Sequence, residues 1–486
     1  MRLLSLGINN LYKDFAKWQE LEEGMAKKQE KQLEFDIKKS DIKIVTERRK
    51  RKNHLINENQ QVQDKRASGL SWFRLDNAAM VYPSSKNEHW TFVYRVSAVF
   101  KEEIDAEILQ KSVDEILPRF PTFDVCLKNG IFWHYFEPSA HRLLCERECE
   151  MPCAYMNLGD PRQHLIRVLY SKHRLSLEVF HAISDGHGAM TFLNSLIARY
   201  LENKGVKLSS GEGYLNYRDL PTQDEIEDSF ITNASGAGGK SHKEKSAYNI
   251  RGTVMSDGLV NVTHAIMSVE NVKEVAAAHK TKLTVLLAAV FCYEILKRRR
   301  NSKKPIKISI PIDLRKEFKS VTMRNFSSYI NIEVSDEKAS LDEIIEIIKN
   351  GLKSANREFL QANIDSNVSL QNNPLIKLVP LAIKDVVLST RFNLLGENLQ
   401  TFAFSNLGPV NCPPEFSDHI LRYEVNLGRS KHNSIAVGVI SFGDVLVLTI
   451  SSKLAENTTE RDVIRKLAEL GVKIKVESNR RDTYGR

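Results

Sequence analysis

Hydrophobic and polar residues alternate in several short stretches of the chain, a spacing that predicts β-strands. The clearest stretch contains Leu175, Leu177 and Val179 at every second position, and the same period places His181 on the buried face at the strand's end. From residue 190 to 201 the apolar positions recur instead at helical spacing. The pattern therefore predicts a histidine at a strand-to-helix corner.

The same periodicities predict elements on both sides of this corner. Before it we expect strands at residues 92–100, 123–127, 131–136 and 165–170 and a helix at residues 109–117. After it we expect helices at 283–297, 341–360 and 459–470, a buried or tunnel-lining helix at 375–388, and strands at 306–312, 329–334, 399–404, 435–440 and 445–451. Alternating strands and helices predict a layered α/β sandwich.

Composition divides the chain into five parts. Residues 1–66 are rich in Lys, Glu, Gln and Asn and predict a polar, flexible extension. Two periodic regions, 67–204 and 251–478, predict two lobes joined by a crossover linker at 205–250, and residues 479–486 form a polar tail.

The corner carries residues suited to proton transfer. A neutral imidazole at His181 can accept a proton because its ordinary pKa, about 6.5, lies close to neutrality. Asp185 can cap the following helix or pair with an arginine, which in either case would fix the loop. The alternative is a core histidine beside a capping aspartate, with no catalytic role.

The sequence His181-Ala-Ile-Ser-Asp185-Gly186 resembles the HxxxDG motif of the chloramphenicol acetyltransferase-like superfamily, which includes condensation domains, plant BAHD acyltransferases and alcohol acetyltransferases. Three further stretches, 72–79, 310–315 and 405–409, follow the order that this resemblance expects. The likeness covers about residues 67 to 478 and is greatest to bacterial alcohol acetyltransferase-type proteins. Condensation domains usually carry a second histidine where this chain has Phe180, so peptide-bond formation is less favoured.

The resemblance implies a two-lobed α/β sandwich of mixed sheets and helices, with an active-site tunnel between two acyltransferase lobes. It implies direct transfer of an acyl group from acyl-CoA, the co-substrate, to an alcohol or amine, with His181 as general base. Asp185 has a structural role in such proteins and pairs with an arginine, for which Arg315 and Arg74 are the candidates; Gly186 and Arg315 then support the motif.

A donor is also needed for the oxyanion of the tetrahedral intermediate. Asn406 and Ser405 are the first candidates, and Ser327 is the second. The residues that bind coenzyme A are not identifiable from the sequence, and we expect no bound cofactor, no metal and a monomer. Two alternatives remain: a catalytically silent binding or regulatory module of the same fold, and a condensation-type enzyme.

Composition limits the class of protein. The 486 residues are 42% hydrophobic and 27% charged, and no run approaches the roughly 18 apolar residues of a membrane helix. The first residues do not resemble a secretory signal, so we expect a cytoplasmic protein. The net charge of +9 comes largely from clusters such as residues 48–52 and 297–304, with no nucleic-acid recognition motif beside them. The second cluster suits either a solvated helix end or a basic rim that attracts the phosphates of coenzyme A.

Two further patterns are weak. Cys145, Cys149 and Cys153 lie four residues apart, but metal sites more often use Cys-x-x-Cys pairs, and we expect reduced thiols. Residues 234–241 match a relaxed phosphate-loop pattern, yet neither a buried strand precedes them nor a helical pattern follows. We therefore expect no nucleotide site there.

Overall fold

The computed structural model describes residues 72–480, except for 77, 86–89, 149–150, 161, 210, 238–243, 257, 300–301, 373–377, 396 and 432. The chain divides into two units, Met1–Ser68 and Gly69–Arg486, and all the described residues lie in the second unit. The predicted extension at 1–66, with its basic cluster at 48–52, lies outside the described residues, and so does the chain after residue 480.

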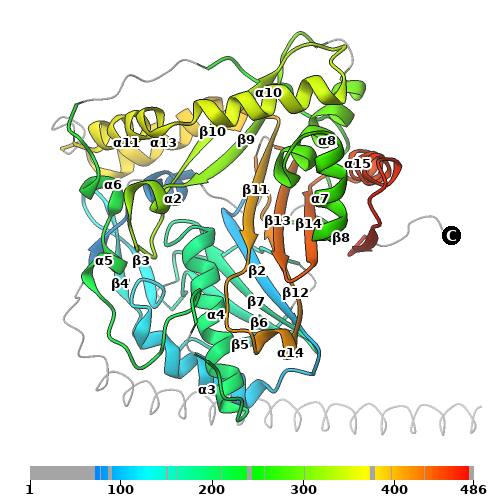
Figure 1. The fold of residues 1–486 in the computed structure, drawn as a ribbon. Helices are drawn as coiled ribbons and strands as arrows, with labels where there is room; N and C mark the ends of the chain where they lie inside the picture. Colours follow the sequence, from blue (N-terminus) through cyan, green and yellow to red (C-terminus); the bar gives the residue numbers. More distant parts are fainter. Residues whose placement is uncertain are drawn as a thin grey trace, which may run out of the picture. The chain divides into compact units, whose positions relative to one another are not determined.

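A five-stranded sheet forms the first lobe, in the order β12-β2-β7-β6-β5. Its strands are β2 (Val93–Phe100), β5 (Cys145–Arg147), β6 (Ile166–Tyr170), β7 (Arg174–Phe180) and β12 (Ile420–Leu427). Helix α4 (Gly186–Asn203) packs on β2 and β7, and α3 (Ala106–Ile116) packs on α4 (Figure 1). β12 comes from the second half of the chain and pairs antiparallel with β2.

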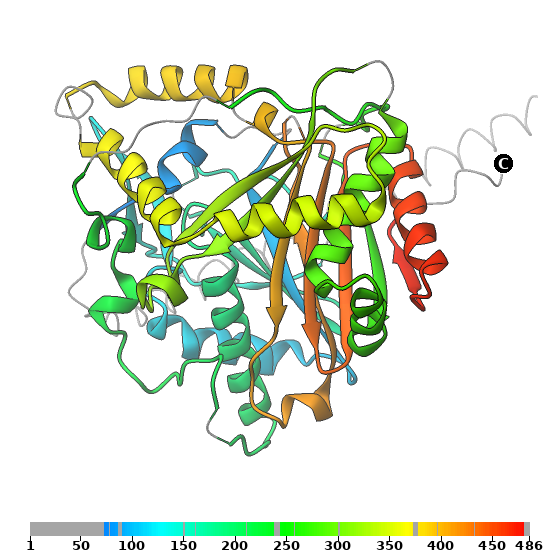
Figure 2. The same cartoon turned by 45° about the horizontal axis from the view of Figure 1, so that its top comes forward.

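A seven-stranded sheet forms the second lobe, in the order β10-β9-β11-β13-β14-β8-β15. Its strands are β8 (Asn261–Ser268), β9 (Ile306–Asp313), β10 (Ser327–Val334), β11 (Phe402–Pro409), β13 (Ile435–Phe442), β14 (Val445–Ser452) and β15 (Lys475–Ser478). Four helices lie along it, with α10 crossing in front of β9, β10 and β11 in Figure 2. They are α7 (Val269–Ala278), α8 (Leu283–Arg298), α10 (Leu341–Ser354) and α15 (Thr458–Glu469). β11 runs parallel to both of its neighbours, β9 and β13.

The remaining elements complete this unit. A third sheet has the order β1-β4-β3, from β1 (Phe73–Arg74), β3 (Val125–Asn129) and β4 (His134–Pro138). The helices are η1 (Ala78–Met80), α2 (Val81–Ser85), η2 (Leu117–Arg119), α5 (Gln223–Ile226), α6 (Ser229–Thr232), α9 (Arg315–Phe318), α11 (Arg357–Asn372), α13 (Leu381–Leu395), η3 (Glu397–Leu399) and α14 (Phe416–His419).

Each lobe has its own hydrophobic core. The core of the first lobe includes Leu177, Val179 and Phe192, together with Tyr423 and Val425 from β12. The core of the second lobe is built around α8, which is apolar on most of its faces and is mostly buried. Among the described residues no single helix is long and apolar enough to cross a membrane, although α7 and α8 meet that criterion as a pair bent by 72°.

The predicted mixed α/β fold is confirmed, and several element boundaries are wrong. The helix expected at 341–360 is two helices, because Asn356 caps a new one through its side chain, which accepts the backbone N–H of Phe359. A buried or tunnel-lining helix was expected at 375–388. Among the described residues, the helix there, α13, begins at Leu381. That helix leaves Ile383, Val386 and Val387 between 54% and 66% exposed.

Two strands also differ from expectation. The alternation in β7 predicts one buried face, but both are buried, and Glu178 lies between Arg95 and Arg167 in an ionic cluster. Residues 405–408, which lie beyond the strand expected at 399–404, belong to β11. The strand is irregular there, because Gly408 has φ of 75° and its N–H donates to the side chain of Asn406.

Candidate active site

The site is built on the tight corner between β7 and α4. Asp185 caps α4 by accepting the backbone N–H groups of His187 and Gly188. A Cβ atom at Gly188 would lie 2.2 Å from both the Met323 carbonyl and the Ser184 hydroxyl, so only glycine fits there. The corner therefore touches the loop before β10, and Ser184 donates a hydrogen bond of 2.6 Å to the Met323 carbonyl.

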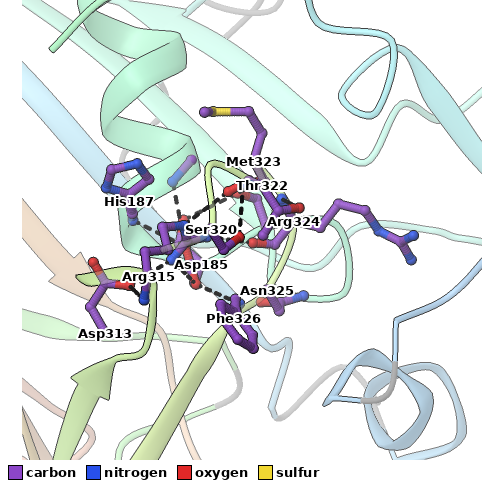
Figure 3. Close-up of polar contacts among 12 residues, drawn as sticks. Asp185, His187, Asp313, Arg315, Ser320, Thr322, Met323, Arg324, Asn325 and Phe326 are labelled. Carbon is purple, nitrogen blue, oxygen red and sulfur yellow. Dashed lines mark hydrogen bonds and ion pairs between the residues drawn. The ribbon is translucent and has the colours of Figure 1, made fainter. Parts of the chain in front are cut away.

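Arg315 holds this corner from the second lobe (Figure 3). Its two terminal nitrogens donate to the two carboxylate oxygens of Asp185 at 2.9 and 3.0 Å. The remaining donors of the guanidinium reach the Asp313 carboxylate and the carbonyls of Thr322 and Arg324. All five N–H groups of the guanidinium are thus used, which a lysine could not reproduce. Of the two arginines considered, Arg315 is the partner of Asp185, whereas Arg74 is exposed on β1.

The environment of Asp185 favours the ionised, negatively charged form of its carboxyl group. Burial raises its pKa, but the charge and hydrogen bonds of Arg315 and the N–H of Phe326 outweigh burial and leave the pKa below its ordinary value. Both carboxylate oxygens accept hydrogen bonds from donors of the protein itself. Asp185 is therefore placed to hold the corner together and not to contact a substrate.

His181 follows directly after β7 and lies between two tyrosines. The ring of Tyr82 stacks on the imidazole at 5.2 Å, and the ring of Tyr94 lies 4.9 Å away on β2. The hydroxyl of Tyr94 lies 2.7 Å from the Asp185 carbonyl, to which it donates. Burial lowers the pKa of His181 below its ordinary value, against the opposite effect of its own carbonyl, Asp185 and Asn325. The ring is therefore neutral at neutral pH, as a general base requires.

Two buried side chains beside His181 were not identified as site residues from the sequence. The side-chain oxygen of Asn325 lies 3.2 Å from His181 Nδ1, and the amide nitrogen of Asn325 donates to Asp76 at 3.0 Å. Burial raises the pKa of Asp76 to about 7. Asp76 falls within the stretch 72–79 noted in the sequence, but nothing in periodicity or spacing connects either residue with His181.

The oxyanion candidates lie on two strands of the second lobe, Ser405 and Asn406 within β11 and Ser327 at the start of β10. Leu407 packs against Gly186, where an added Cβ would approach its side chain to 2.6 Å, so the part of β11 with Ser405 and Asn406 adjoins the corner. The Asn406 amide donates to Thr284 at 2.7 Å and accepts from the Gly408 N–H, and therefore also shapes the strand. Ser327 is the first residue of β10, two positions after Asn325.

The structure also has a half-open cavity of about 330 Å³, and His181 is not among the residues that line it. Its walls include Phe73, Ile226, Asp228 and Arg324. The tunnel implied by the family resemblance stays a prediction.

The weaker sequence patterns add no chemistry to the described region. The described residues hold no cluster of three or more His, Cys, Asp or Glu side chains suited to a metal ion. Of the three spaced cysteines, Cys149 lies outside the described residues, and burial raises the pKa of Cys145 to about 12. In the loop 234–241, Ser235 is bound to Asp365, and residues 238–241 are not described.

Comparisons with known proteins bear on the fold. No protein-family model matches the sequence, and a search of curated proteins gives no match. Solved structures do match. Polyketide synthase associated protein 5 from Mycobacterium tuberculosis is 14% identical with a TM-score of 0.54, over 82% of this chain and 97% of that one.

Two other solved structures agree with this match. Trichothecene 15-O-acetyltransferase from Fusarium sporotrichioides is 11% identical with a TM-score of 0.51, over 82% of this chain and 96% of that one. The first condensation domain of the calcium-dependent antibiotic synthetase is 12% identical with a TM-score of 0.53, over 82% and 97%. The chain therefore has the fold of the CoA-dependent acyltransferases and condensation domains.

Proposed function

We propose that this protein is an acyltransferase that moves an acyl group, acetyl in the simplest case, from coenzyme A to a hydroxyl or amine acceptor. The observation that carries the proposal is His181, a neutral imidazole at the corner between β7 and α4 whose Nδ1 faces the oxygen of Asn325. The other ring nitrogen, Nε2, then retains its lone pair. The fold is consistent with acyl transfer.

The reaction proceeds by direct transfer within a ternary complex. His181 Nε2 takes the proton from the acceptor's hydroxyl or amine as that atom attacks the thioester carbonyl. The carbonyl π electrons move onto oxygen to give a tetrahedral oxyanion. As the intermediate collapses, the C–S bond breaks and His181 returns the proton to the leaving thiolate of coenzyme A.

Ser405 is the preferred oxyanion donor in this proposal. A single such donor contributes about 2.7 to 4 kcal/mol to the transition state. Asn406 adjoins Ser405, but its amide already bonds Thr284 and Gly408, so its removal would disturb β11 as well. Ser405→Ala is therefore the cleaner test, and Ser327→Ala is its comparison on β10.

A condensation-type reaction is the second candidate, because condensation domains share the fold. Such an enzyme would take its acyl group from a carrier-bound pantetheine thioester and form an amide or ester. The residue before His181 is Phe180 and not a second histidine, which favours the first proposal. Comparing acyl-CoA with acyl-pantetheinyl carrier protein as donor separates the two.

The experiment that tests the proposal is a screen of acyl-CoA donors against alcohols and amines, followed by release of free thiol. His181→Ala should lower the rate about 100- to 10,000-fold, the usual range for loss of a general base. The matched control is His279→Ala, which removes an imidazole at the end of α7 that pairs with Asp342. If no donor is consumed, and labelled acceptors still bind, the protein is the silent member of the fold.

Intact-protein mass spectrometry after incubation with acyl-CoA alone tests direct transfer. We expect no covalent adduct, because a proton-transferring base forms no bond with the acyl group. Burial also raises the pKa values of Cys292 to about 12 and Cys412 to about 11, so these thiols are protonated at neutral pH. A stoichiometric acyl adduct would show a double displacement and contradict this mechanism.

A further inference from the structure

The orientation of the Asn325 side chain is set by its surroundings. Its amide nitrogen lies 3.3 Å from the Ala182 carbonyl, which can only accept a hydrogen bond, and 3.0 Å from Asp76. An amide nitrogen carries two donors and the amide oxygen none. Because both donors point at these acceptors, the oxygen must be the atom that faces His181 Nδ1 at 3.2 Å.

This orientation determines which nitrogen of His181 carries the hydrogen. The Asn325 oxygen can only accept, so Nδ1 must donate to it. In a neutral ring the single hydrogen then lies on Nδ1. The base for the acceptor substrate is consequently Nε2.

Asp76 holds Asn325 in place from behind. Its carboxylate is completely buried and accepts the Asn325 backbone N–H at 3.3 Å as well as the amide at 3.0 Å. Its second oxygen accepts the Ala79 N–H at 2.8 Å, which orders the turn that leads into α2. α2 carries Tyr82, whose ring stacks on His181. Asp76 thus acts on the imidazole from two directions.

We propose that Asp76 and Asn325 are positioning residues, which hold His181 as the Nδ1–H tautomer and so leave Nε2 as the base. The expected effect of these residues on kcat rests on the proposed acyl transfer. The tautomer of His181 does not depend on it. Neither residue is asked to touch the substrate.

Kinetics of full-length variants form the first part of the test. Asn325→Ala and Asp76→Ala should each lower kcat about 10- to 100-fold, the usual cost of losing an orienting partner, with little change in KM for the acyl donor. Asp76→Asn should lower kcat less than Asp76→Ala, because its amide oxygen still accepts both bonds from Asn325 while its amide nitrogen loses the bond from Ala79. Asn194→Ala is the matched control, since Asn194 is equally buried and bonds the carbonyls of Gly213 and Asn411.

The second part measures the tautomer directly, and needs no activity. Nitrogen-15 NMR of protein with labelled imidazole rings is recorded at a pH above the pKa of His181, and the His181 signals are assigned by comparison with His181→Gln. The spectra should show the hydrogen on Nδ1 in the wild type and in Asn194→Ala. Asn325→Ala and Asp76→Ala should shift the signals toward the Nε2–H form, and Asp76→Asn should not.

The two parts distinguish the failure of this inference from failure of the proposed function. An unchanged tautomer in both Asn325→Ala and Asp76→Ala would overturn the inference even if the enzyme transfers acyl groups. A protein inactive with every donor, but with the expected tautomer shifts, would support the inference and contradict the proposed function. If Asn325→Ala does not fold, Asp76→Ala decides: a shift toward the Nε2–H form supports the inference, and the wild-type tautomer overturns it.

Discussion

Individual residues of this site fall into two groups. His181, Asp185 and Gly186 lie within six positions of one another, and the resemblance of this short stretch to a known motif identified them in the sequence. Asn325 and Asp76 reach the same site from far away, since Asn325 is 144 positions from His181 and 249 from Asp76. Such neighbours are set by how strands and loops pack together, and no local pattern encodes them.

The ion pair of Asp185 and Arg315 should be important for stability. Asp185→Ala would leave the buried guanidinium with only Asp313 as a charged partner, and the expected loss is about 3 kcal/mol. The double variant Asp185→Ala with Arg315→Met should recover part of that loss, because it removes both buried charges. Urea denaturation of the four proteins measures the coupling. An Asp185→Ala variant as stable as the wild type would contradict the structural role of Asp185.

Asp76 should make stability depend on pH. Its pKa is raised from 3.8 to about 7, mainly by burial and also by Asp228, against the effect of Arg324. The folded protein therefore binds this proton more tightly than the unfolded chain. The resulting stabilisation is complete below about pH 4 and is lost as the pH rises through about 7.

Asp76→Asn cannot lose such a proton. Relative to the wild type, its free energy of unfolding should therefore rise between pH 5 and pH 8, by about 2 to 4 kcal/mol. Because other titrating groups are common to both proteins, they cancel in the difference. Urea denaturation at the two pH values measures it, and a difference that does not change with pH would refute the assignment.

Among the elements, those with strong periodicity were the most predictable. α4, α8 and the hairpin of β13 and β14 lie close to where their apolar positions placed them. β12 was missed although its sequence, ILRYEVNL, alternates polar and apolar residues as a strand does, and its partner β2 cannot be deduced from local pattern. α13 was expected to be buried because it is apolar, yet composition alone does not say which helix the sheets cover.

The start of α4 should tolerate no side chain at Gly188. A methyl group there would meet a backbone carbonyl and a buried hydroxyl, neither of which can move without opening the corner. Gly188→Ala should therefore lower both the melting temperature and the activity. Gly186→Ala is the matched comparison, since its Cβ meets only the flexible side chain of Leu407 and should cost less. Equal effects of the two would argue against the tight corner.

At the scale of the whole molecule, every described element lies within Gly69–Arg486. Removing residues 1–66 should therefore leave cooperative unfolding and, if the proposed function holds, activity unchanged. Thermal unfolding and the thiol-release assay on the truncated and full-length proteins test this. A truncated protein that unfolds without a cooperative transition would show that the extension belongs to the fold.

The pairing of β12, from the second half of the chain, with the sheet of the first lobe has a consequence for biosynthesis. β2 has β7 on one side and β12 on the other, and Phe100 pairs with Ile420, about 320 residues later in the chain. At about 5 to 20 residues per second, a ribosome needs roughly 15 to 60 s to supply the missing strand. During that interval β2 has an unpaired edge, and its eight residues, all buried in the folded protein, are exposed. Such an edge can pair with a strand of another nascent chain. The first lobe is thus complete only when most of the second has been made.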